Sequence, residues 1–85
     1  MKQFSYTITD PAGIHARPAG LLAQAARKYD AVCSISSKGK SARLTQLIQL
    51  MGMGVKQGDS VTVTVDGPDE EAAASGILAF MQANL

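Results

Sequence analysis

The strongest constraint on the fold is a regular alternation of apolar and polar side chains in four short stretches. It is clearest in residues 61–65, where valines alternate with threonines, and it recurs in residues 3–9, 32–37 and 41–44. A period of two predicts β-strands that bury one face and leave the other in water. Parallel sheets are covered on both faces, so this pattern favours a single antiparallel sheet with one open face.

Helical patterns fill the gaps between these strands. An alanine-rich stretch continues to about Lys28, a short apolar stretch covers residues 46–51, and a longer one covers residues 70–84. Thr45 and Asp69 are predicted to cap the second and third helices, because a short polar side chain can accept a hydrogen bond from the first helical turn. The predicted fold is therefore α+β, with element order βαββαβα. It is an open-faced two-layer sandwich in which three helices cover one face of a four-stranded antiparallel sheet.

Length and composition exclude several functions. The 85 residues suffice for one small domain, residues 1–85, with a single core. A net charge of +1 and the lack of a basic run argue against binding to nucleic acid, which requires many cations against the phosphates. Cys33 is the only cysteine, so no internal disulfide can form, and we expect it buried on a strand. One histidine and one cysteine do not make an ordinary metal site.

The sequence also predicts where the protein works. Its first residues lack the basic-then-apolar pattern of a signal peptide, and no apolar run is long enough to span a bilayer. Together with the single cysteine, this predicts a cytoplasmic protein that does not insert into membranes. We expect a monomer that needs neither a metal nor another cofactor.

The chemistry is expected in residues 13–18, which read Gly-Ile-His-Ala-Arg-Pro and hold the only histidine. A turn over residues 10–13 precedes the histidine and the first helix follows it, so His15 is predicted at or beside the helix N-cap. Pro18 agrees with this placement, because the first helical turn tolerates a proline. That turn also presents free N–H groups and a partial positive charge, which favour a bound anion.

His15 and Arg17 together have the chemistry needed to hold a phosphoryl group. The positive field of the helix end disfavours an imidazolium, so we expect a neutral imidazole with a nucleophilic lone pair near neutral pH. The Arg17 guanidinium matches phosphate oxygens as a planar fork. The alternative is that His15 is only a helix cap or an ordinary surface residue.

The segment of residues 44–55 is too apolar for a loop, but a helix this short cannot bury all of its large side chains. Leu50 is expected inside, and Leu47, Ile48 and Met51 at least partly exposed. An exposed apolar patch marks a partner surface, and methionine adapts to several partners. The alternative is that all of these side chains belong to the core.

In these features the chain resembles the histidine-containing phosphocarrier proteins, the HPr family of the bacterial phosphoenolpyruvate:sugar phosphotransferase system. Residues 13–19 look like the active-site signature of that family. The turn at residues 38–40 and the Met-Gly-Met-Gly run at residues 51–54 stand where the family has its hairpin turn and the end of its second helix. The resemblance extends over essentially the whole chain.

The resemblance implies a function and its partners. Enzyme I, charged by phosphoenolpyruvate, would pass a phosphoryl group to Nδ1 (the pros nitrogen) of His15, which would hand it to the IIA domain of a sugar permease. Arg17 and the backbone N–H groups of Ala16 and Arg17 would stabilise the phosphoryl group. Both partners would bind one surface, formed by the surroundings of His15 and the exposed apolar side chains of the 44–55 segment. The protein would then be a carrier and not an enzyme.

One position departs from the family pattern. In the Gram-positive branch the second helix begins with a regulatory serine, which an ATP-dependent HPr kinase phosphorylates, and alignment places Gln46 there. Glutamine cannot accept a phosphoryl group, and the hydroxyl of the neighbouring Thr45 would be turned by about 100° around a helix. We infer that the transport relay is retained and that the serine-dependent corepressor role is lost.

Two other functions stay open. The chain could be a regulatory HPr paralogue that uses the same phosphohistidine in a signalling relay. It could also be an interaction module that binds partners through the exposed apolar side chains around Leu47 and Met51 without phosphoryl chemistry, although an intact His15 and Arg17 speak against this. A stand-alone enzyme is disfavoured, because no second acid or base stands near His15 and the sequence holds no nucleotide-binding loop.

Overall fold

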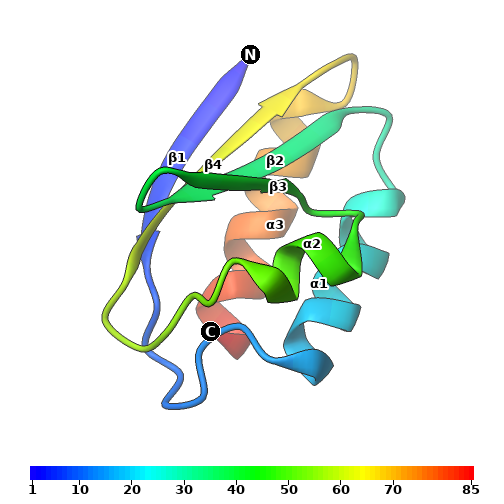
Figure 1. The fold of residues 1–85 in the computed structure, drawn as a ribbon. Coiled ribbons are helices and arrows are strands. Elements are labelled where there is room, and N and C mark those ends of the chain that lie inside the picture. Colours follow the sequence, from blue (N-terminus) through cyan, green and yellow to red (C-terminus); the bar gives the residue numbers. More distant parts are fainter.

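The structure, a computed structural model, describes residues 1–85, and its elements follow the predicted order (Figure 1). The strands are β1 (Lys2–Thr7), β2 (Val32–Ser37), β3 (Lys40–Arg43) and β4 (Ser60–Asp66). The helices are α1 (Ala16–Arg27), α2 (Leu47–Gly52) and α3 (Glu70–Asn84). The strands form one antiparallel sheet in the order β1-β4-β2-β3, and the three helices lie on one of its faces.

The alternation along the strands separates the two faces of the sheet, as predicted. The row of cross-strand neighbours that faces the helices consists of Phe4, Val63, Ile35 and Ala42. The next row, on the open face, consists of Ser5, Thr62, Ser36 and Ser41. Val63, Ile35 and Ala42 are buried and Phe4 is half-buried, whereas no residue of the hydroxyl row is buried. One face therefore carries the core and the other meets water.

Each helix contributes to that core through few residues. Leu22 of α1, Leu50 of α2, and Ile77 and Met81 of α3 are all fully buried. Cys33 is buried on β2 as predicted, and burial raises the pKa of its thiol. Since α2 has only six residues and no side-chain cap, Leu50 is a main anchor of that helix.

The predicted helix caps are wrong in their side-chain contacts. Gln46, not Thr45, is the N-cap of α2, and the carbonyl of Thr45 instead accepts a hydrogen bond from Nη2 of Arg27 (2.9 Å). Asp69 does occupy the N-cap of α3, but its carboxylate accepts the N–H of Asp30 (2.7 Å). In both places a contact between distant segments replaces the local cap, and these contacts join the end of α1 to the other helices.

The hairpin between β2 and β3 is one residue tighter than expected. Ser37 pairs with Lys40, so only Lys38 and Gly39 form the loop, and both have positive φ (53° and 79°). This is the backbone of a two-residue type I′ turn, which matches the twist of the strands. The turn directs Lys38 toward Asp59, with 3.0 Å between Nζ and Oδ1.

Asp59 gives the fold a dependence on pH. Its carboxylate accepts the N–H of Lys56 (2.9 Å) and pairs with Lys38, and these two contacts lower the pKa of Asp59 below 3.8. A carboxyl group whose pKa is lowered by folding stabilises the protein above its unfolded pKa and loses this contribution as pH falls through its folded pKa. We expect the melting temperature to fall upon acidification below about pH 4, and to fall less in Asp59→Asn. Thermal melts of the wild type and of Asp59→Asn at a series of pH values above and below about 4 test this expectation. An equal fall in melting temperature for the two proteins would contradict it.

Candidate functional site

His15 is the N-cap residue of α1, which confirms the predicted position, and its side chain is exposed. The backbone carbonyl of His15 accepts the first hydrogen bond of the helix from Ala19 (2.9 Å). The imidazole makes no capping hydrogen bond. The ring therefore accepts no hydrogen bond from the N–H groups of the helix end, and both of its nitrogens are available to other groups.

A tight turn precedes His15. The N–H of Gly13 donates to the carbonyl of Asp10 (2.9 Å), and the N–H of Ala12 donates to Oδ1 of Asp10 (2.8 Å). The second bond is an Asx turn, in which a side chain takes the place of a backbone acceptor. These bonds confirm the turn predicted over residues 10–13.

The end of this turn is attached to the segment that follows α2. The N–H of Ile14 donates to the carbonyl of Val55 (3.2 Å), and Ile14 is buried. Gly13 has a φ of 66° and lies so close to Val55 that a Cβ atom would clash with its carbonyl oxygen. Only glycine combines this conformation with this approach, so Gly13 fixes where His15 begins the helix.

Two backbone donors remain free at the start of α1. The N–H groups of Ala16 and Arg17 donate to no group of the chain, and Pro18 has no N–H. The α1 helix has 12 residues, enough for its aligned peptide dipoles to place a partial positive charge at this end. The arrangement favours an anion beside His15.

A hollow of about 390 Å³ lies against this helix end. Its lining consists of Asp10, His15, Arg17, Pro18, Leu21, Ala83 and Asn84. The side chain of Arg17 is exposed and makes no ion pair, so its guanidinium is free to meet an anion there. The structure thus brings the two predicted residues His15 and Arg17 to one concave site.

Sequence reasoning missed the remaining walls of this hollow. Ala83 and Asn84 come from the end of α3, and no local pattern places them near residue 15. Leu21 could have been found from the sequence. It lies off the face of α1 that buries Ala19, Leu22 and Ala26, and a leucine off the buried face of a helix is exposed (40%). Asp10 was recognised only as part of the turn, so the expectation that no second acid stands near His15 is wrong.

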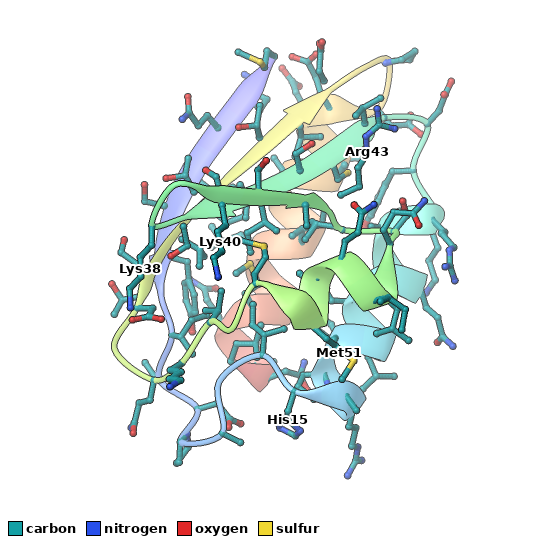
Figure 2. The ribbon with its side chains drawn as sticks, viewed as in Figure 1. His15, Lys38, Lys40, Arg43 and Met51 are labelled. Carbon is teal, nitrogen blue, oxygen red and sulfur yellow. The ribbon has the colours of Figure 1, made fainter.

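The apolar residues of α2 divide between core and surface. Leu50 is fully buried, Leu47 is half-buried, and Met51 and Ile48 are exposed (40% and 80%). The alternative that all of them belong to the core is therefore wrong. Because α1 packs against α2, Met51 and His15 lie toward the same end of the molecule (Figure 2). We call Leu47, Ile48 and Met51 the apolar patch.

Gln46 and Thr45 lie where α2 begins. Gln46 is exposed and its side chain makes no capping hydrogen bond. Thr45 is half-buried and is held through its carbonyl by Arg27. The exposed N-cap position of α2 therefore carries an amide, and the neighbouring Thr45 is less accessible.

Comparison with known proteins decides the family. A family model described as the PTS HPr component phosphorylation site matches residues 2–83, nearly the whole chain. The chain belongs to the HPr family. Members of this family are phosphocarriers of the phosphotransferase system and not catalytic enzymes.

Individual relatives agree with this assignment. The phosphocarrier protein HPr of Mycoplasma genitalium is 39% identical over 85 residues, which cover 99% of this chain and 97% of the relative. That of Mycoplasma pneumoniae is 37% identical over 83 residues, with 96% and 94% covered. A solved histidine-containing phosphocarrier protein from Mycoplasma superimposes with a TM-score of 0.94 at 35% identity and covers 96% of this chain and 93% of its own. The predicted open-faced sandwich is confirmed.

Two further properties bear on the site. No helix combines the length and the apolar composition required to cross a bilayer. Nowhere do three side chains of histidine, cysteine, aspartate or glutamate gather in a way that could hold a metal ion.

Proposed function

We propose that residues 1–85 act as one phosphocarrier domain, which accepts a phosphoryl group on His15 from phosphorylated enzyme I and passes it to IIA domains of sugar permeases. The observation that carries this proposal is an exposed histidine with an unused side chain at the positive end of α1, beside the free N–H groups of Ala16 and Arg17. Membership in the HPr family supports the same role.

The transfer uses the lone pair of one ring nitrogen, Nδ1 by analogy with the family. The lone pair forms the new N–P bond while the bond between phosphorus and the donor breaks, and the donor keeps that electron pair. The other ring nitrogen keeps its proton, so a cationic ring lies beside an anionic phosphoryl group. Arg17 and the two backbone donors stabilise the negative charge on the phosphoryl oxygens, and the same steps in reverse release it.

The apolar patch is the proposed contact for both partners. Two of its members, Ile48 and Met51, are exposed without any cover in the chain, and aromatic or aliphatic side chains of a partner can bury them. Because Met51 and His15 lie toward the same end of the molecule, a partner bound to the patch also meets His15 (Figure 2). Binding through one surface means that donor and acceptor must take turns.

Met51→Glu is expected to weaken binding to enzyme I by about tenfold or more, because a charge then lies in a desolvated contact. Its stability should change by no more than about 0.5 kcal/mol, since Met51 is exposed. Calorimetric titration and thermal melts measure the two effects. Gln3→Glu places the same charge on the open face of the sheet and should leave binding unchanged. Gross unfolding of Met51→Glu would show instead that Met51 is a core residue.

Gln46 argues against control by an HPr kinase. Its amide cannot accept a phosphoryl group, and because it is uncharged it is a poor mimic of phosphoserine. Thr45 is a doubtful substitute, since it is half-buried and its carbonyl is tied to α1. We propose that regulation through this position is lost while transfer through His15 is retained.

Incubation with enzyme I and phosphoenolpyruvate tests the proposal. We expect one added phosphoryl group by intact mass, removed by acid and spared by base, as a phosphohistidine requires. Purified IIA domains of sugar permeases should then discharge it. Discharge only by regulatory domains would favour the regulatory paralogue, and no incorporation with an active enzyme I would favour an interaction module.

A further inference from the structure

Asp10 lies in the hollow beside His15, and the structure fixes it firmly. Its N–H donates to Leu85 (2.8 Å), its carbonyl accepts from Gly13 (2.9 Å), and its Oδ1 accepts from Ala12 (2.8 Å). The residue is half-buried, and no cation of the chain pairs with its carboxylate. An uncompensated negative charge is therefore held in place at the proposed phosphoryl site.

The other acidic side chains do not share this position, although the terminal carboxylate at Leu85 accepts the N–H groups of Thr9 and Asp10. Asp59 is paired with Lys38, at the β2–β3 hairpin. The rest surround the junction of β4 with α3, at the end of α3 remote from the hollow (Figure 1). These residues are Asp30, Asp66, Asp69, Glu70 and Glu71. Asp10 is the only acidic residue that lines the hollow.

The walls of the hollow have opposite signs. The start of α1 and the Arg17 guanidinium are positive, whereas Asp10 and the end of α3 at Ala83 and Asn84 are negative, because a helix ends in partial negative charge. A hollow of about 390 Å³ is comparable in width with the Debye length, about 8 Å at physiological ionic strength. Charges on its walls are therefore only partly screened from one another.

We propose that Asp10 sets how readily phosphorylated His15 gives up its phosphoryl group, an inference that rests on the proposed function. A phosphoryl group brings roughly −1.5 to −2 charges into the hollow, and a fixed carboxylate repels it. This repulsion raises the free energy of the phosphorylated state relative to the free one.

A phosphocarrier must release its phosphoryl group as well as bind it. A site with positive walls only would stabilise the phosphoryl group and retain it, and the acceptor would then receive it in low yield. Asp10 opposes the attraction of α1 and Arg17, so the group is bound and still released. Its action is on the equilibrium, and His15 remains the only group that forms a bond to phosphorus.

The variant Asp10→Asn isolates this charge. Its amide oxygen can still accept the N–H of Ala12, and its backbone hydrogen bonds do not depend on the side chain. Isotope-labelled wild type and unlabelled variant are mixed in equal amounts with a limiting supply of phosphoryl groups and catalytic enzyme I. Exchange through enzyme I then lets the two carriers compete for the phosphoryl group until equilibrium. Intact mass gives the phosphorylated fraction of each.

We expect the phosphoryl group to favour Asp10→Asn over the wild type by about fivefold at low salt, and by less at high salt. The control Glu71→Gln removes a charge at the remote end of α3 and should give a ratio near one. A ratio near one for Asp10→Asn would overturn the inference. Failure of both carriers to become phosphorylated would instead refute the proposed function. A loss of stability shared by the free and phosphorylated forms leaves this ratio unchanged.

Discussion

His15→Ala is expected to lose all acceptance of phosphoryl groups while keeping its fold. The imidazole is exposed and makes no capping hydrogen bond, so its removal takes away no interaction within the chain that the structure records. The first hydrogen bond of α1 runs to the backbone carbonyl of residue 15 and is independent of the side chain. The free energy of unfolding should therefore change by no more than about 0.5 kcal/mol, as for other exposed positions.

Intact mass after incubation with enzyme I and phosphoenolpyruvate measures acceptance, and thermal melts measure stability. His15→Gln is the matched control, because it keeps a polar side chain at the N-cap and lacks the ring nitrogen that attacks phosphorus. It should be as inert as His15→Ala. If either variant still takes up a phosphoryl group, another residue is the acceptor. A base-labile product would then point to a carboxylate such as Asp10.

Local patterns were sufficient to predict the sheet and the position of His15. The alternation of apolar and polar side chains indicates which face of a strand is buried, and it correctly predicted Val63 and Ile35 in the core. The turn at residues 10–13 and Pro18 together place His15 at the N-cap, because both depend on backbone chemistry within a few residues. The second helix is also a local feature. Because it is too short to bury all of its large apolar side chains, Ile48 could be predicted at the surface.

Contacts between distant segments could not be predicted in this way. Thr45 and Asp69 have the side chains of helix caps, yet Arg27 and Asp30 engage these two residues across the fold instead. The hollow beside His15 depends on the end of α3, about seventy residues away in the chain, so its negative wall has no local signature. The family signature pointed to His15 as the phosphoryl acceptor, whereas only the structure showed that Asp10 lines the same hollow.

Arg17→Glu is expected to slow phosphoryl transfer from enzyme I by roughly 100-fold or more, the usual effect of losing a preorganised charge at a reacting anion. The substitution replaces a guanidinium in the hollow with a carboxylate that repels the phosphoryl oxygens. Its fold should not suffer, because Arg17 is exposed and unpaired. A glutamate in the first turn of α1 even favours the helix, so the melting temperature should stay equal or rise.

Single-turnover transfer at saturating enzyme I separates the chemical step from binding. Arg17→Lys, which keeps the charge and loses the planar fork, should be slowed less than Arg17→Glu. If the transfer rate at saturation falls in both variants, and falls further in Arg17→Glu than in Arg17→Lys, then Arg17 contacts the phosphoryl group. A weaker affinity with an unchanged rate at saturation would show that Arg17 contacts the partner instead. An unchanged rate and affinity would remove the Arg17 side chain from the mechanism and leave the backbone N–H groups as the donors at the helix end.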